Sequence, residues 1–188
     1  MRKLRDKMQI VLRRLTEADL EKTMHWRMDP DITRYMNTDP VLTLEGQKKW
    51  FQKISQDETV RYWMIVVDGE DAGVINLADI DYEKGESNWG YYVGEKKLRS
   101  LKLSLTLEWN LYDYVFEIMG FKRLYNEVLS ANEGVVKLHV MCGSRIDAIY
   151  PEHVEKNGVK YDVTAISITA QEWAAKKATV KYEKIEMV

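Results

Sequence analysis

The sequence predicts an α+β fold in which helices flank a mixed, largely antiparallel central sheet. Strand and helix patterns do not alternate regularly: helical segments follow the first strand, and three strands then follow one another directly. With 45% hydrophobic and 31% charged residues, the chain can bury a substantial core. We expect one domain over 1–188, with flexible or peripheral ends at 1–8 and 178–188.

The N-terminal third predicts one strand and three helical segments. An apolar pattern over 9–15 indicates the strand. Thr16 is an N-cap candidate followed by acidic residues, and the helix that it opens should end near Met28, before an Asp-Pro pair. A short helical turn is expected over 31–37 and a longer helix over 43–57.

The middle of the chain predicts three successive strands and a long helix. Apolar runs over 62–67, 72–77 and 88–93 are typical of strands, and an Asp-Gly pair between the first two predicts a tight turn. A stripe of apolar residues at helical spacing follows, and Gly120 is placed to end it. The stripe consists of Leu101, Leu105, Trp109, Tyr112, Phe116 and Met119.

The C-terminal third predicts a strand, a helix, a hairpin and a last helix. The strand covers 122–129, and the helix begins after Asn132 as a cap candidate and ends at Gly143. The Asn-Gly pair at 157–158 is a strong hairpin signal. The residues Thr-Ala-Gln-Glu at 169–172 form a capping box that opens the last helix.

Charge and motif content exclude several classes of function. The 28 basic and 30 acidic residues give a net charge of -2, which argues against general binding to nucleic acid or to a membrane surface. Cys142 is the single cysteine, so the chain fits a reducing compartment, and we expect a cytoplasmic protein with this thiol in its core. The motifs GxxxxGK[ST], GxGxxG and GxSxG are absent from the sequence.

The junction between the third of these strands and the long helix is a candidate anion site. A helix N-terminus presents unpaired backbone N–H groups and the positive end of the helix dipole. Residues 95–100 add two lysines and an arginine directly before it. The combination suits phosphate or pyrophosphate, and a solvated basic loop is the structural alternative.

Residues 99–104 resemble the pyrophosphate loop of the GNAT family of acetyl-CoA-dependent N-acetyltransferases, [Q/R]-x-x-G-x-[G/A]. Arg99 matches, Ser104 is a small residue at the position of the glycine or alanine, and Lys102 stands at a glycine position. The element order resembles the family over about 9–172. The resemblance implies a GNAT-like fold, acetyl-CoA as co-substrate and no metal. It implies these cofactor-binding residues: Tyr92, Val93, Arg99, Ser100, Leu101, Lys102, Leu103 and Ser104.

A second resemblance begins at Asn132, where the family has N-x-x-A-x-x-L-Y-x-x-x-G-F. Asn132, Leu138 and Gly143 match the pattern. His139 takes the place of the tyrosine, which in the family is a general acid toward the CoA thiolate, and an imidazolium can do the same. The resemblance adds Asn132 and Lys137 to the cofactor-binding residues. A histidine packed on a helix face, without a chemical role, is the alternative.

The segment 26–38 and the C-terminal hairpin resemble one branch of the family, the amino-sugar N-acetyltransferases of pseudaminic acid biosynthesis. The segment begins W-R-M-D-P-D-I, and the hairpin covers 152–163. Ribosomal-protein and polyamine acetyltransferases share part of the first pattern. The branch implies a small-molecule acceptor, the 4-amino group of a nucleotide-linked 4-amino-4,6-dideoxy sugar, bound by the first helices and their loop.

Each acceptor-side candidate has a structural alternative. Arg27 could hold a diphosphate through forked hydrogen bonds, or bond to helix-terminal carbonyls or to Asp29. Met36, Trp50 and Trp63 could line a slot for the sugar ring and its methyl group, or pack in the core.

Glu127 is the candidate general base for the attacking amine, directly or through water. The alternative is that its side chain faces solvent and has no chemical role. Asn76 and Asp79 are weaker candidates for this role, and Asn126 could orient a water molecule.

Two other functions remain open. Departures from the family motifs at Lys102, His139 and Ser144 also fit a protein that binds a ligand without catalysis. The acceptor could instead be a protein N-terminus or a polyamine, although Lys48 and Lys49 argue against the strongly acidic site that a polyamine needs. The many aromatic residues are also compatible with a homodimer.

Overall fold

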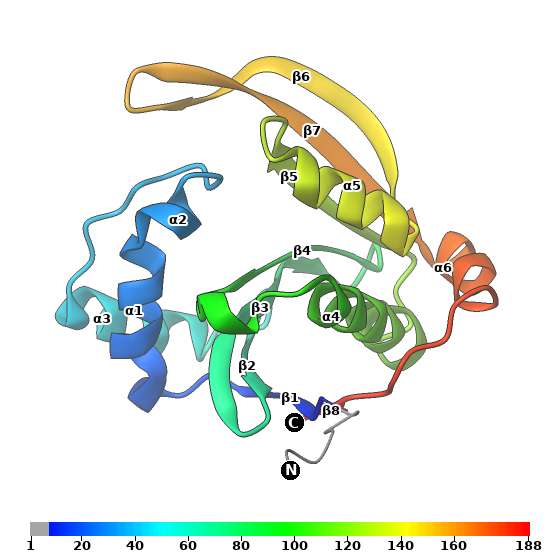
Figure 1. The fold of residues 1–188 in the computed structure, drawn as a ribbon, viewed down its shortest axis with the longest axis horizontal. Helices are drawn as coiled ribbons and strands as arrows, with labels where there is room; N and C mark the ends of the chain where they lie inside the picture. The colour runs from blue at the N-terminus through cyan, green and yellow to red at the C-terminus, as the bar shows by residue number, and fades with distance from the viewer. Residues whose placement is uncertain (1–7) are drawn as a thin grey trace, which may run out of the picture.

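The computed structural model describes residues 8–188, and its centre is an eight-stranded sheet (Figure 1). The strand order across the sheet is β6-β7-β5-β4-β3-β2-β1-β8. The pairs β4–β5 and β1–β8 are parallel, and the other neighbouring pairs are antiparallel. The predicted α+β class with a mixed, largely antiparallel sheet is therefore confirmed. The expectation for residues 1–7 lies outside the described residues.

The predicted strands and helices are present at the expected places in the chain. The strands are Ile10–Arg14 (β1), Arg61–Val67 (β2), Glu70–Asp81 (β3), Glu86–Val93 (β4), Arg123–Leu129 (β5), Arg145–Lys156 (β6), Val159–Thr169 (β7) and Glu186–Met187 (β8). The α-helices are Leu20–Met28 (α1), Pro30–Thr33 (α2), Leu44–Ile54 (α3), Leu101–Asp113 (α4), Glu133–Cys142 (α5) and Ala170–Lys177 (α6). Strand β8 was not predicted, because two residues carry no pattern.

Capping chemistry explains where the helices begin and end. The Thr43 hydroxyl accepts a backbone N–H of the first turn of α3 at 3.2 Å, and Thr169 and Glu172 form the predicted capping box of α6. Gly143 ends α5 with a φ of +117°, which favours glycine. Asn132 occupies the cap position of α5, but its side chain makes no capping bond.

Helix α4 packs against the sheet and is buried on more than one face. Its buried apolar side chains are Leu103, Leu107, Trp109, Leu111 and Tyr112. Leu101, which we expected on the buried stripe, is 56% exposed because it lies in the first turn, before the helix enters the core. The polar Glu108, Asn110 and Asp113 are also buried, and each has hydrogen-bond partners. A helix surrounded in this way can carry buried polar groups toward a site.

Residues 178–188, which we expected to be flexible or peripheral, are held on the sheet and on α4. Strand β8 pairs with β1, and the Asn110 side chain bonds the backbone of this segment at 2.9 and 3.1 Å. Asp113 accepts hydrogen bonds from Tyr182 and Lys184. Polar groups of α4 therefore fix a segment whose own sequence lacks a strong pattern.

Strands β4 and β5 diverge, and their divergence opens the sheet. They pair only between Glu86 and Asn88 of β4. Beyond this point β4 stays paired with β3 as far as Val93, and β5 stays paired with β7 as far as Leu129. The facing edges of the two strands therefore lack a neighbouring strand, and such an edge can pair with an extended ligand.

Candidate active site

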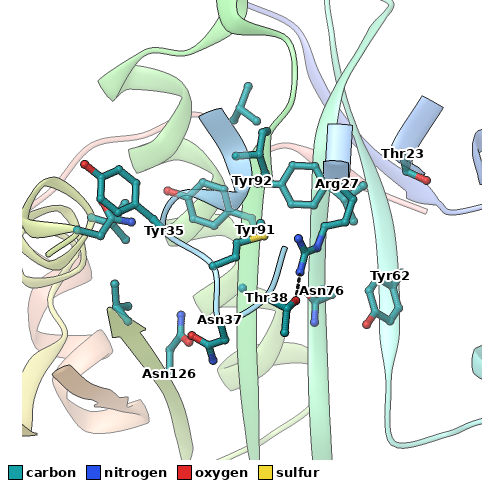
Figure 2. Close-up of a pocket in the computed structure, with 18 of the residues that line it drawn as sticks. Thr23, Arg27, Tyr35, Asn37, Thr38, Tyr62, Asn76, Tyr91, Tyr92 and Asn126 are labelled. Carbon is teal, nitrogen blue, oxygen red and sulfur yellow. Dashed lines mark hydrogen bonds between the residues drawn. The ribbon is translucent and has the colours of Figure 1, made fainter. Parts of the chain in front are cut away.

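A cavity of about 640 Å³ lies where β4 and β5 diverge (Figure 2). We call β4, β5, α5 and the start of α4 its cleft side, and α1, α2, α3 and the loop 34–43 its lid. Most side chains that we expected at an active site line it. These are Arg27, Met36, Trp50, Asn76, Tyr92, Val93, Arg99, Ser104, Asn126, Glu127, Asn132 and His139.

On the cleft side, the first turn of α4 leaves backbone N–H groups available. Ser100 is the N-cap: its Oγ accepts from the Leu103 N–H at 3.2 Å, and its carbonyl accepts from the Ser104 N–H at 3.1 Å. Within residues 8–188, the N–H groups of Leu101 and Lys102 have no partner. Of the amides that we expected to bind an anion, these two are therefore free to do so.

The basic side chains near this helix start lie mostly outside the cavity. Arg99 lines it and donates its Nε–H to the Val93 carbonyl at 2.9 Å. Lys102 is exposed and does not line the cavity, so its side chain leaves the helix start open. Lys137 is also exposed, and its ammonium lies 2.9 Å from the Glu133 carboxylate. Any contact of these two lysines with a ligand would come from outside the cavity.

On the lid, Trp26 fixes α1 against the end of β4. The buried indole donates its Nε1–H to Glu95 at 3.2 Å. A Cβ at Gly94 would lie 2.2 Å from the indole ring, so a glycine is required for this contact. Because Trp26 packs here, the next residue, Arg27, is held at the wall of the cavity.

Arg27 is a cation in the cavity without a carboxylate partner among the described residues. Its Nη2 donates to the Thr38 hydroxyl at 3.1 Å, the dashed line in Figure 2. Its Nη1 is buried and unpartnered in the described part of the chain. Burial lowers the pKa of Arg27, and the nearby Tyr92 and Asp39 oppose that effect. A buried N–H without an acceptor is costly, so this position suits a ligand with acceptor atoms, above all an anion.

The loop of the lid is fastened by a residue of the distant β6–β7 hairpin. Lys156 is buried at the end of β6, and its ammonium donates to the carbonyls of Thr33 at 2.7 Å and Met36 at 3.2 Å. It also lies 2.9 Å from the Asp39 carboxylate. Figure 1 shows the hairpin tip beside the loop after α2. We call these contacts the latch; sequence analysis missed Lys156 because its partners lie about 120 residues away.

Acidic side chains of the lid are already paired with lysines. Asp31, which lines the cavity, pairs with Lys96, and Asp39 pairs with Lys156. Hydrogen bonds from these lysines hold the pKa of each aspartate below its ordinary value. The lid thus presents an unpaired positive charge at Arg27, while these two negative charges are neutralised.

The aromatic candidates separate into cavity and core. Trp50 lines the cavity and packs edge-on against Tyr62, with ring centroids 5.1 Å apart. Trp63, which we expected in the acceptor slot, is only 1% exposed and packs against Tyr114 in the core. Successive residues of a strand point to opposite faces, so Tyr62 faces the cavity and Trp63 cannot. Trp63 is therefore a core residue.

His139 lies at the inner wall of the cavity, against a buried carboxylate that sequence analysis missed. The ring is 2% exposed, and its Nδ1 lies 2.9 Å from Oε1 of Glu108 in α4. The hydroxyls of Tyr91 and Tyr112 donate to the same carboxylate at 3.1 and 2.9 Å. The available signal was that Glu108 lies one helical turn before Tyr112, on the face that packs against the cleft.

The candidate base lies on β5. Glu127 lines the cavity from an exposed position, and the Asn126 side chain accepts its backbone N–H at 2.7 Å. Asn76 also lines the cavity, whereas Asp79 is exposed outside it. Of the carboxylates predicted as bases, Glu127 is therefore the one that lines the cavity.

Two kinds of feature are absent from residues 8–188. No group of three or more His, Cys, Asp and Glu side chains there is placed to hold a metal ion. Within the same range, every helix is too short or too polar to cross a membrane.

Known proteins share this architecture. Residues 9–145 match the family model of the acetyltransferase (GNAT) domain. Curated relatives include the uncharacterized N-acetyltransferase p20 of Bacillus licheniformis, 23% identical over 88% of this chain and 95% of that protein. Acetyltransferase PseH of Campylobacter jejuni is 27% identical over 66% of this chain and 76% of that protein. A solved spermidine N-acetyltransferase of Vibrio cholerae, in complex with CoA and spermine, has a TM-score of 0.83 at 21% identity, over 88% of this chain and 98% of that one. The matched residues include β4, β5, α4 and α5, and the chain belongs to the GNAT family of acetyltransferases.

Proposed function

We propose that this protein transfers the acetyl group of acetyl-CoA to an amine of a small molecule that also carries an anionic group. We favour the 4-amino group of a nucleotide-linked 4-amino-4,6-dideoxy sugar. The observation that carries the choice of acceptor is the buried Nη1 of Arg27, which lacks a partner in the described part of the chain. A diphosphate supplies the acceptors that this nitrogen needs, and the resemblance of the segment 26–38 to the amino-sugar branch supports the same choice.

Acetyl-CoA, which supplies the acetyl thioester, fits the cleft side. The open edge of β4 beside Tyr92 and Val93 suits the extended pantetheine arm. The free N–H groups of Leu101 and Lys102 suit the pyrophosphate. Backbone N–H groups of β4 would polarise the thioester carbonyl, as an oxyanion hole does.

The proposed reaction is a direct transfer. The amine attacks the carbonyl carbon of the thioester, the C–S bond breaks and CoA leaves as the thiolate. His139 gives a proton to the sulfur, and Glu127 takes the proton of the amine, directly or through a water held by Asn126. Both side chains line the same cavity.

A polyamine acceptor is less suited to the charges of the lid. The acids Asp31 and Asp39 are paired with lysines, and Arg27 would repel a polycation. The likeness to the spermidine enzyme is a likeness of fold at 21% identity.

Release of thiol from acetyl-CoA tests the proposal with three acceptors: a UDP-linked 4-amino-4,6-dideoxy sugar, spermidine and a peptide with a free N-terminus. We expect the sugar to have a kcat/KM at least about tenfold above the other two. A preference for spermidine or the peptide contradicts the acceptor. Transfer to none of the three, together with no heat on titration with CoA and no thermal shift, contradicts the function.

A further inference from the structure

A buried carboxylate behind the cavity wall joins three elements of the cleft side. Glu108 of α4 is fully buried. Its Oε1 accepts from the Tyr91 hydroxyl at 3.1 Å and lies 2.9 Å from Nδ1 of His139, and its Oε2 accepts from the Tyr112 hydroxyl at 2.9 Å. The Tyr112 oxygen lies 3.2 Å from Oγ of Ser144. Donors therefore approach both carboxylate oxygens, as an ionised carboxylate requires.

The other titratable groups of this cluster are neutral donors. Burial raises the pKa of Tyr91 and Tyr112 well above the ordinary value, and the nearby Glu108 adds to both shifts. Burial likewise raises the pKa of the Cys142 thiol far above its ordinary value. These groups can donate hydrogen bonds to Glu108, but they bring no positive charge to balance it.

A protonated His139 is the cation that can pair with Glu108. The charge of Lys176 in α6 acts against the rise in the pKa of Cys142. No lysine or arginine of residues 8–188 forms an ion pair with Glu108. A buried carboxylate without a cation is costly, and His139 is the side chain placed to supply a positive charge when it takes up a proton. With Nδ1 directed at the carboxylate, Nε2 is the nitrogen left for a ligand, and it has no partner among the described residues.

We propose that Glu108 is the positioning residue of the acetyl-transfer reaction: it holds His139 with Nδ1–H toward α4 and Nε2 toward the cavity, and it stabilises the protonated ring. The proposal rests on the proposed function, in which His139 is the general acid. As the C–S bond breaks, the Nε2 proton passes to the sulfur. Nδ1–H stays bonded to Glu108, and the ring becomes neutral in the tautomer that takes up its next proton at Nε2.

Labelling of the histidine ring nitrogens with ¹⁵N tests this arrangement without any substrate. The chain has three histidines, His25, His139 and His153, and the variant His139→Phe assigns the signals. We expect Nε2 of His139 to lose its proton as the pH rises, while Nδ1 keeps its own. In Glu108→Gln, which keeps the shape and removes the charge, the neutral ring should carry its proton on Nε2 as well as on Nδ1.

Either of two results overturns the proposal. One is a wild-type ring that keeps its proton on Nε2 and loses it from Nδ1. The other is a neutral ring in Glu108→Gln that still carries its proton on Nδ1 alone. The first measurement uses the wild-type protein alone, so it decides the question even where the variant fails to fold.

Kinetics with acetyl-CoA and the UDP-linked amino sugar give a second readout. Glu108→Gln should lower kcat about tenfold or more at pH 8, lower it less at pH 6, and change the KM for acetyl-CoA by less than about twofold. In the His139→Phe background the same substitution should leave kcat unchanged, because Glu108 acts through His139. An equal loss of kcat in both backgrounds shows a structural role only and overturns the proposal.

Asp113→Asn is the matched control, since Asp113 is a buried carboxylate of the same helix that bonds the C-terminal segment instead of the cleft. We expect this variant to have a lower Tm and an unaltered pH–rate profile. A profile displaced as in Glu108→Gln would assign the effect to the stability of α4 and overturn the proposal. Failure of the proposed function is distinguishable: a wild-type protein that acetylates none of the acceptors still shows which nitrogen of His139 titrates.

Discussion

The cleft side of the cavity offers a ligand mainly backbone groups, whereas the lid offers side chains. An open edge of β4 and the N–H groups of Leu101 and Lys102 stand on one side. Arg27 stands on the other, in a lid fastened by Lys156 from about 120 residues away. Almost every residue has a backbone N–H, so the cleft tolerates departures such as Lys102. The lid depends on individual side chains, and a single substitution there should alter the choice of acceptor.

We expect the largest departure from this pattern at His139, a cleft residue that would act through its side chain. His139→Phe should lower kcat on the order of 10²-fold, with CoA affinity nearly unchanged, since the leaving thiolate loses its proton donor. Steady-state kinetics with calorimetric titration of CoA measure both quantities. Undiminished kcat at saturating substrate would show that the ring only packs.

His139→Tyr restores the residue of the family motif and should retain much of the activity. Activity requires the protonated acid, so it falls as the pH rises past that acid's pKa. A phenol has a reference pKa of about 10 and an imidazolium about 6.5, so the fall should come at higher pH in His139→Tyr. A pH–rate profile of the two proteins checks the direction, and a fall at lower pH in the variant would contradict the acid role.

Arg27→Met should affect binding of the acceptor at the lid and leave binding of acetyl-CoA at the cleft side unchanged. We expect the KM for the sugar acceptor to rise more than about tenfold, because a charge-assisted bond to the acceptor is lost. The KM for acetyl-CoA should stay within about twofold, and Tm should change little, because removal of a buried N–H without a partner offsets the loss of the bond to Thr38. Equal changes in both KM values would show that Arg27 supports the whole cavity.

Lys156→Met should also weaken binding of the acceptor and not of acetyl-CoA, but by less than Arg27→Met does. Loss of the ammonium removes its hydrogen bonds to the Thr33 and Met36 carbonyls and its ion pair with Asp39, and should cost about 1–3 kcal/mol of stability. We expect the acceptor KM to rise about three- to tenfold and the acetyl-CoA KM to stay unchanged. Lys160→Met, on an exposed lysine of the same hairpin, is the matched control. An effect on acetyl-CoA alone would argue against a role for the latch.

Ser100→Ala should have the smallest effect. The Ser100 side chain caps α4, whereas the groups proposed to bind CoA at this helix start are backbone N–H groups. Loss of this N-cap should cost about 1 kcal/mol of stability. The freed Leu103 N–H becomes a further donor, so CoA affinity should change by less than about threefold. Calorimetric titration with CoA measures this, and a tenfold loss would show that the cleft depends on side chains as much as the lid does.

Local signals account for what the sequence could predict. The cap at Thr43, the glycine at Gly143 and the turn at 157–158 each act within a few residues, so the order of elements could be predicted from them. The helix start that follows β4 was predicted from that order. Arg27 and His139 were found because they lie in recognisable motifs that the fold then brings to one cavity.

The remaining features depend on distant partners. Both faces of β2 are covered, so its run is apolar throughout and does not show that Tyr62 faces the cavity and Trp63 the core. Glu108 is polar within a buried helix, and only its partners from β4 and α5 explain it. The residues around Lys156 in the sequence do not indicate that its partners lie in the lid.

The latch also has a consequence for the order in which the molecule is assembled. Strands β2, β3 and β4 pair with partners that are near in sequence, whereas the lid is secured only once Lys156, about 120 residues further along the chain, has reached it. Closing so long a loop carries an entropic cost that early contacts do not meet. In a refolding experiment with pulsed hydrogen exchange, amides of the loop after α2 should therefore gain protection later than those of β2 and β3.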